Sequence, residues 1–147
     1  MTEPQPAQEP LDSALDWVAD HTRRYVATGG QDGHDWRGAP CLVLTTRGRT
    51  SGRLRRNALI YGTDGEDLVI VASKGGDDHH PLWYLNLEAD PAVTVQVGAD
   101  VFAARARTAS PEEKAQLWPR LVEIWPAYAD YQARTSRDIP VVVLERA

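Results

Sequence analysis

The sequence has one cysteine among its 147 residues, and none of its apolar runs is long enough to cross a membrane. A single thiol cannot form an internal disulfide or a multi-cysteine zinc or iron–sulfur site, and it suits a reducing cytoplasm. A membrane-spanning helix needs about 20 apolar residues, whereas the longest runs here, at 41–44 and 68–72, have the length of strands. Segment 1–10 is polar and proline-rich, unlike a signal peptide. We therefore expect a cytoplasmic protein.

Positive charge is also in deficit, because 16 lysines and arginines face 21 aspartates and glutamates, for a formal net charge of -5. This balance disfavours a nucleic-acid partner, which needs an excess of positive charge. The length of the chain suits one domain. We expect that domain over residues 11–147, after a disordered tail at 1–10.

Positive charge is nevertheless concentrated in segment 47–56, which holds five arginines and no acidic residue, so the rest of the chain carries -10. A guanidinium group pairs through two hydrogen bonds with a phosphate or a carboxylate. Glycines such as Gly48 and Gly52 leave backbone N–H groups free to bind oxyanions. The segment therefore predicts a receptor for a polyanion, and a solvated hairpin tip is the alternative. An RNA-binding barrel would use the same arginines, but the acidic remainder disfavours it.

Apolar periodicity and turn residues predict a series of strands joined by tight turns. The expected strands cover 40–46, 54–62, 67–73, 92–97, 101–108 and 140–145. The Asp64-Gly65 pair is a strong hairpin signal between the second and third of them. This order predicts an α+β fold in which a mostly antiparallel sheet closes as a six-stranded barrel.

Helices are expected before and between these strands. An amphipathic helix should run from Asp12 to Gly29, and a short one should cover 81–90. Ser110 begins a further helical run with a capping-box pattern, and Pro119 and Pro126 should break this run into short pieces. The first helix is acidic, so contact with an anionic membrane surface is not favoured.

Two groups of residues suit a binding pocket. Segment 72–76 follows a strand and offers Ser73 as a hydrogen-bond donor, Lys74 as a cation and two glycines that allow close approach of a ligand. Aromatic residues gather at 83–84 and 118–131, where they suit a pocket for a flat ring system. Packing in the hydrophobic core is the alternative for each of these rings.

Two other features do not favour a site. Segment 77–80 contains two aspartates and two histidines, but adjacent side chains diverge and cannot easily share a metal ion. Cys41 lies inside an apolar run, which is typical of a buried and unreactive thiol.

Four motifs in this order resemble the deazaflavin-dependent nitroreductase family: LTTRGRTSG at 44–52, ASKGG at 72–76, PLWYLNL at 81–87 and WPAYADY at 125–131. The resemblance extends over roughly residues 22–146. It implies a split β-barrel that binds coenzyme F420, a 5-deazaflavin with a phosphate and an oligoglutamate tail. That tail is a polyanion of the kind that the arginine segment predicts.

The resemblance also implies the residues of the site. Those expected to contact the cofactor are Arg49, Thr50, Ser51, Arg55, Arg56, Asn57, Ala58, Leu59, Ile60, Val71, Ala72, Ser73, Lys74, Gly75, Leu82, Trp83, Tyr84, Leu85 and Asn86. Those expected on the substrate side, as candidate catalytic residues, are Tyr128, Tyr131, Ser73 and Trp125. Thr50 stands where the family often has lysine, and Trp125 and Ile60 replace aromatic residues of the family, so the resemblance leaves the substrate open.

By the same resemblance, the protein is expected to be an F420H2-dependent oxidoreductase that transfers a hydride to an electron-poor acceptor, such as a quinone or a nitroaromatic compound. A non-catalytic F420 carrier and an FMN-dependent reductase of the same barrel class are the alternatives. The five arginines exceed what the single phosphate of FMN needs. We expect a monomer or homodimer with a small-molecule acceptor and with neither nucleic acid nor metal.

Overall fold

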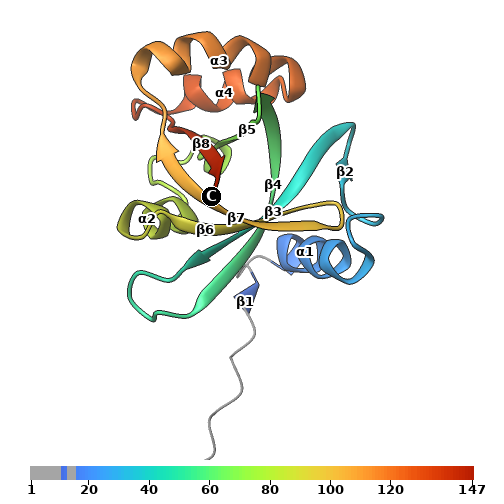
Figure 1. The fold of residues 1–147 in the computed structure, drawn as a ribbon. Coiled ribbons are helices and arrows are strands. Elements are labelled where there is room, and N and C mark those ends of the chain that lie inside the picture. The colour runs from blue at the N-terminus through green and yellow to red at the C-terminus, as the bar shows by residue number, and fades with distance from the viewer. Residues whose placement is uncertain (1–10, 13–15) are drawn as a thin grey trace, which may run out of the picture.

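The computed structural model describes residues 11–12 and 16–147, and its centre is a closed barrel of six strands (Figure 1). The barrel strands are β3 (Ala39–Arg47), β4 (Leu54–Asp64), β5 (Asp67–Val71), β6 (Ala92–Val97), β7 (Asp100–Thr108) and β8 (Val141–Arg146). They pair in the order β3-β4-β5-β8-β7-β6, and β6 returns to β3, with every pairing antiparallel. The predicted α+β barrel is therefore confirmed. The tail predicted at 1–10 lies outside the described residues, and the single domain stays a prediction.

Two tight turns set the register of the hairpins. Asp64 pairs with Asp67 across the β4–β5 hairpin, which leaves a two-residue turn that starts at Gly65 with φ of 61°. Two-residue hairpin turns need a positive φ at this position, and glycine adopts it without strain. Gly98 has the same role between β6 and β7, with φ of 60°.

The described part of the chain has four α-helices packed around the barrel. They are α1 (Asp16–Thr28), α2 (Leu82–Ala89), α3 (Pro111–Ile124) and α4 (Ala127–Arg134), and a short 3-10 turn, η1 (Lys74–Gly76), precedes α2. α1 packs against β3 and β4, α2 against β3, and α3 against β4 and α4. Figure 1 shows α3 and α4 together at one end of the barrel. None of the described helices has both the length and the apolar character needed to span a membrane.

α3 begins with the predicted capping box and continues through its internal proline. Ser110 Oγ accepts a hydrogen bond from Glu113 N, and the Glu113 carboxylate accepts one from Ser110 N. The prediction that Pro119 breaks this helix is wrong, because α3 continues past it, whereas the predicted break at Pro126 is confirmed, because this residue lies between α3 and α4. A proline inside a helix costs about 3 kcal/mol. Leu117 and Leu121, on either side of it, are buried against the barrel and hold both halves in one helix.

The segments around α1 differ from the prediction in two ways. α1 begins at Asp16 rather than at Asp12, and β1 (Leu11–Asp12) pairs in parallel with β4 instead. β2 (Asp35–Trp36), which lies between the first expected helix and the first expected strand, pairs with β3. Backbone N–H and C=O groups at a sheet edge need hydrogen-bond partners. β1 and β2 supply such partners to β4 and β3, and only the folded sheet brings these segments together.

Several barrel strands are buried on both faces, which explains their unbroken apolar runs. In β8, Val142 and Leu144 face the barrel interior, whereas Val141 and Val143 pack under α3 and α4. β3 and β5 follow the same alternation between the interior and the covering helices. A strand covered on both sides needs apolar residues at consecutive positions rather than at every second one.

Candidate active site

A cavity of about 680 Å³ lies on the outside of the barrel, where β4 meets the helices and the η1 turn. This volume is typical of a small-molecule site. The lining residues are Trp17, Val18, His21, Trp36, Cys41, Arg55, Asn57, Ala58, Leu59, Ile60, Val71, Ser73, Lys74, Gly75, Pro81, Leu82, Trp83, Asn86, Trp125, Tyr128 and Tyr131. They come from segments that are far apart in the sequence, between Trp17 and Tyr131, so the cavity is a product of tertiary folding.

The strongly charged side chains of the cavity wall are cationic. Arg55 and Lys74 line it, and no aspartate or glutamate does so among the described residues. Neither side chain forms a hydrogen bond or an ion pair within the ranges that the structure describes. Cations that form no hydrogen bond or salt bridge beside an apolar wall attract an anionic ligand, because the low local dielectric strengthens charge pairing.

The arginine-rich segment forms the β3–β4 turn, and hydrogen bonds hold this turn against α2. Arg49 N donates to Asn86 Oδ1 at 3.1 Å, and Asn86 Nδ2 donates to Thr46 Oγ1 at 3.2 Å. Asn86 also lines the cavity. The guanidinium Nε of Arg53 in the same turn is buried without a hydrogen-bond partner in the described part of the chain. The turn therefore adds positive charge beside the cationic wall.

The η1 turn has an unusual backbone. Lys74, Gly75 and Gly76 have φ angles of 46°, 64° and 85°. A residue with a side chain, such as Lys74, is strained by roughly 1–2 kcal/mol in this left-handed region. Strain of this kind is concentrated at functional sites, where the surrounding structure holds it in place. Here it brings Ser73, Lys74 and Gly75 into the cavity wall.

Gly76 is the point where η1 contacts α4, and its replacement should be costly. A Cβ at this position would lie 2.8 Å from Tyr131 O and 3.0 Å from Tyr131 Cα, and the φ of Gly76 is 85°. We expect Gly76→Ala to lower the free energy of unfolding by roughly 2–3 kcal/mol, because left-handed strain adds to a backbone clash. Urea denaturation measures this loss.

Gly75 supplies the matched control for that substitution. Its φ of 64° lies in the same region, but a Cβ there would meet nothing within 4 Å. Gly75→Ala should therefore cost only the left-handed strain, roughly 1 kcal/mol. Equal losses in the two variants would show that the contact with Tyr131 does not matter.

Aromatic side chains of α4 form another part of the wall. The rings of Tyr128 and Tyr131 meet edge to face with centroids 6.2 Å apart, as expected for residues three positions apart on a helix. Trp118 of α3 backs Tyr128, with centroids 6.3 Å apart. Burial raises the pKa of Tyr128, so its hydroxyl stays protonated at physiological pH. Tyr131 is half-buried and therefore more accessible from the cavity.

Most of the predicted site residues line this cavity. They are Arg55, Asn57, Ala58, Leu59, Ile60, Val71, Ser73, Lys74, Gly75, Leu82, Trp83, Asn86, Trp125, Tyr128 and Tyr131. Five others are not part of its wall: Arg49, Thr50 and Ser51 in the β3–β4 turn, Arg56 on β4 and Leu85 on α2. Contacts of these five residues with a cofactor tail outside the cavity stay a prediction.

Two predicted cofactor contacts, Ala72 and Tyr84, lie in the barrel core and not in the cavity wall. The hydroxyl groups of Tyr84 and Thr108 share a hydrogen bond of 2.8 Å. Successive residues of a helix point about 100° apart, and here Trp83 both lines the cavity and packs in the core cluster, whereas Tyr84 packs in that cluster without lining the cavity. Contacts of Ala72 and Tyr84 with a cofactor stay a prediction.

Six lining residues were not predicted: Trp17, Val18, His21, Trp36, Cys41 and Pro81. Trp36 of β2 stacks on both Trp17 and His21, with centroids 5.4 Å apart and planes inclined by 23° in each case. His21 Nε2 donates to Gly33 O at 2.6 Å, which fixes the histidine ring. Trp17 and His21 are four residues apart and share a face of α1. That spacing was the available signal for this wall.

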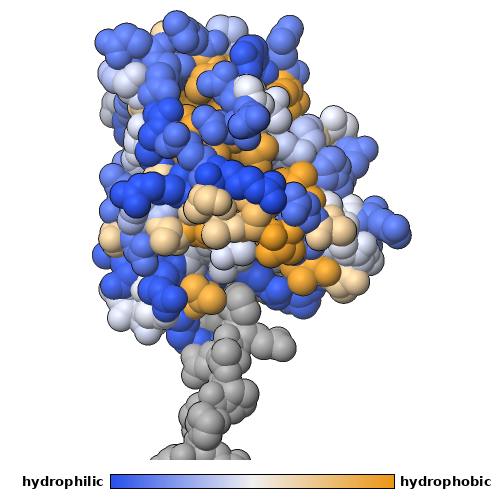
Figure 2. Space-filling view, viewed as in Figure 1, coloured by the Kyte–Doolittle hydropathy of each residue, from blue (hydrophilic) through white to orange (hydrophobic). Residues whose placement is uncertain are grey.

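Large apolar side chains are exposed around the cavity. Trp17 is 58% exposed and Leu82 is 70% exposed, and both line the opening. On the face drawn in Figure 2, apolar patches alternate with polar side chains. Exposed apolar side chains that line a cavity mark ligand and partner sites more often than isolated ones do.

Cys41 is buried as predicted, although it touches the cavity wall. Burial raises the pKa of its thiol to about 12, and the negative charge of Asp35 adds to the effect. The reactive thiolate is therefore almost absent at neutral pH.

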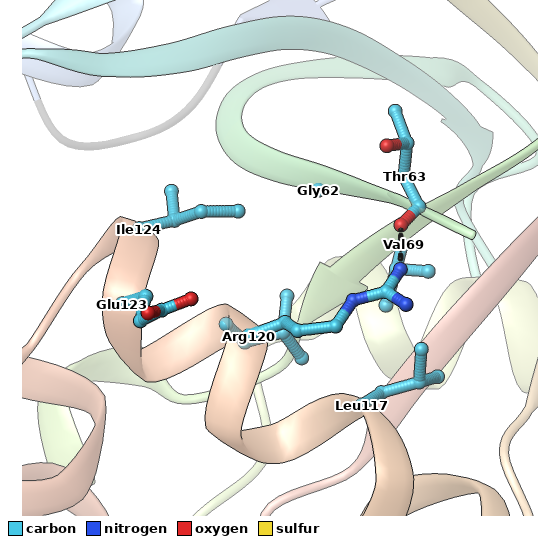
Figure 3. A pocket seen from close by; sticks show the side chains of 8 residues that line it. Gly62, Thr63, Val69, Leu117, Arg120, Glu123 and Ile124 are labelled. Carbon is cyan, nitrogen blue, oxygen red and sulfur yellow. Dashed lines mark hydrogen bonds between the residues drawn. The ribbon is translucent and has the colours of Figure 1, made fainter. Parts of the chain in front are cut away.

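A second cavity of about 290 Å³ lies between α3 and the end of β4 (Figure 3). Arg120 reaches across it, and Nη2 of this residue donates to Thr63 O at 2.5 Å, the bond that Figure 3 marks with a dashed line. None of the predicted site residues lines this smaller cavity. We therefore assign the candidate active site to the larger one.

A closed antiparallel barrel whose outer cavity combines aromatic walls with cationic side chains has a site suited to an anionic ligand with a flat ring. The chain belongs to the F420H2-dependent quinone reductase family, whose family model matches residues 17–146. The resemblance noted in the sequence motifs is thereby confirmed.

Individual relatives agree with this family. An F420H2-dependent quinone reductase of Mycobacterium tuberculosis is 44% identical over 130 residues, which cover 86% of this chain and 87% of the relative. A solved structure of an F420-H2 dependent reductase is 42% identical, with a TM-score of 0.67, and the match covers 72% of this chain and 94% of that one. A solved structure described as a domain-swapped dimer is 40% identical, with a TM-score of 0.69. This match covers 90% of this chain and 100% of that one.

Proposed function

We propose that this protein is an F420H2-dependent reductase that binds reduced F420 in the 680 Å³ cavity and passes a hydride to a quinone. The observation that carries the proposal is the cavity wall, in which the side chains of Arg55 and Lys74 form no hydrogen bond or salt bridge with other described residues and aromatic rings supply flat apolar surface.

The residues of this chain fit the chemistry of F420. Its phosphate and glutamate tail are anionic, which suits Arg55, Lys74 and the arginine-rich β3–β4 turn. Its ring system is flat, which suits the apolar stretch of β4 and the side chain of Trp83. The absence of carboxylates from the described wall removes the groups that would repel such a ligand.

Reduced F420 supplies a hydride from its ring carbon C5 when it is bound, which is a transfer of two electrons at once. A quinone that accepts one hydride needs one further proton to become a hydroquinone. We assign the delivery of that proton to the hydroxyl group of Tyr131, which lines the cavity and is half-buried. Trp125 and Tyr128 hold the acceptor against the wall and exclude water from it.

Quinones are the preferred acceptors in this proposal because the family is described by that activity. Nitroaromatic compounds are a second acceptor class, since they too are flat and electron-poor and suit the same aromatic wall. Of the two assembly states expected from the sequence, the relative described as a domain-swapped dimer favours the homodimer.

Fluorescence titration of the purified protein with F420, in parallel with FMN, tests the cofactor. Oxidation of reduced F420 by menadione, a soluble quinone, then tests the reaction. We expect saturable binding of F420 alone, followed by turnover. Binding without turnover on any quinone or nitroaromatic acceptor would favour the carrier alternative. Binding of FMN instead would favour the flavin alternative, and no binding of either would contradict the proposed site.

A further inference from the structure

We propose that Arg137 is a positioning residue of the active site, which holds the η1 turn in the shape that binds F420; this inference rests on the proposed function. Arg137 follows α4 and does not line the cavity itself. Its guanidinium group donates to three carbonyl oxygens: Ala72 O at 3.1 Å, Ser73 O at 2.8 Å and Asp77 O at 2.9 Å. These carbonyls lie on both sides of the turn, so one rigid group ties its two ends together.

The neighbours of Arg137 extend this clamp. Nη1 of Arg137 also donates to His80 Nδ1 at 3.1 Å. Thr135 Oγ1 donates to Asp78 Oδ1 at 2.8 Å and accepts from Arg137 N at 3.2 Å. Gln132 Nε2 donates to Arg137 O at 2.8 Å. The segment that ends α4 therefore holds the whole stretch 72–80 through side-chain contacts more than 50 positions apart in the sequence.

The η1 turn needs such a restraint because its own backbone favours other shapes. Three consecutive residues with positive φ include Lys74, which has a side chain. Two glycines follow it, and glycine has the most conformational freedom to lose when a turn is ordered. A turn that is already ordered before binding spares the ligand that ordering cost, which raises affinity.

The clamp also couples two parts of the site. Through the η1 turn, Arg137 fixes Ser73 and Lys74 in the cavity wall. Through the short link to α4, it fixes the same turn relative to Tyr131, whose backbone contacts Gly76. The position of the cation that binds the anionic cofactor and the position of the tyrosine that faces the acceptor thus depend on one guanidinium group. Lysine cannot replace it, because an ammonium group lacks the planar fork that reaches three carbonyls.

Two substitutions, Arg137→Ala and Arg137→Lys, test this inference by the Kd for F420 in the fluorescence titration. We expect Kd to rise about tenfold or more in both variants, because the η1 turn is then no longer ordered before F420 binds. The positive charge that Arg137→Lys retains does not restore this order. Arg105→Ala, an exposed arginine on β7 outside the cavity wall, is the control and should leave Kd unchanged. The amides of Gly76 and Asp77, which donate within the turn to Ser73 O and Lys74 O, should exchange hydrogen faster in both Arg137 variants.

Chemical rescue separates positioning from a general structural role. Guanidinium chloride at low, non-denaturing concentration should restore F420 binding to Arg137→Ala, whereas sodium chloride at equal ionic strength should not. An unchanged Kd in both variants would overturn the inference. A raised Kd that is accompanied by a lower Tm and is not restored by guanidinium chloride would also overturn it, because the loss of binding would then reflect general destabilisation. Failure of the wild-type protein to bind F420 would instead contradict the proposed function, which keeps the two failures distinct. If Arg137→Ala does not fold, Arg137→Lys decides by the same Kd and exchange measurements.

Discussion

Replacement of Arg55 by alanine should weaken F420 binding by roughly 1.5–3 kcal/mol, which is roughly 10- to 150-fold in Kd. Arg55 lies on β4 in the cavity wall and has no anionic partner among the residues that the structure describes. Its guanidinium group is therefore free to form a charge-assisted pair with the anionic part of the ligand. No internal ion pair is broken by the substitution, so the effect on folding should be small.

Fluorescence titration at low and high salt measures this loss. The difference between wild type and Arg55→Ala should shrink at high salt, because screening weakens the pair in the wild-type protein. Arg105→Ala on the exposed face of β7 is again the control for the removal of one positive charge. Equal Kd values for wild type and Arg55→Ala would remove Arg55 from the site and leave the cation role to Lys74 and the β3–β4 turn.

Replacement of Tyr131 by phenylalanine should lower kcat for menadione reduction by about 100-fold, the lower part of the range for general acid catalysis. The substitution removes one hydroxyl group and keeps the ring that meets Tyr128 edge to face. The Kd for F420 should therefore stay close to the wild-type value, because the ring surface of the wall is retained. Stopped-flow oxidation of reduced F420 by menadione measures the step directly.

Tyr128→Phe is the matched comparison. Tyr128 is only 5% exposed, and its burial raises the pKa of the hydroxyl, which makes it a weaker acid than an accessible tyrosine. Its loss should reduce kcat much less than the loss of the Tyr131 hydroxyl. The assignment fails if Tyr131→Phe turns over menadione at the wild-type rate, and the roles are reversed if only Tyr128→Phe is slow.

The barrel could be predicted because its signals are local. The Asp64-Gly65 pair marks a hairpin whose turn residue has the positive φ that the sequence pattern requires. The capping box at Ser110 marks the start of α3 within one residue. Pro119 shows where such reasoning fails, since burial of Leu117 and Leu121 outweighs the local preference of proline.

The sequence by itself determined the barrel, the arginine-rich turn and the motifs that point to F420, because turn chemistry, strand patterning and charge density are properties of neighbouring residues. Only the tertiary structure decided which side chains meet in the cavity. The wall of Trp17, His21 and Trp36 forms when β2 pairs with β3 beside α1, and the position of Trp83, but not of Tyr84, in the cavity wall follows from the orientation of α2 on the barrel. The clamp of Arg137 on Ser73 likewise joins residues 64 positions apart. Such contacts depend on how distant elements pack, and no local pattern specifies that packing.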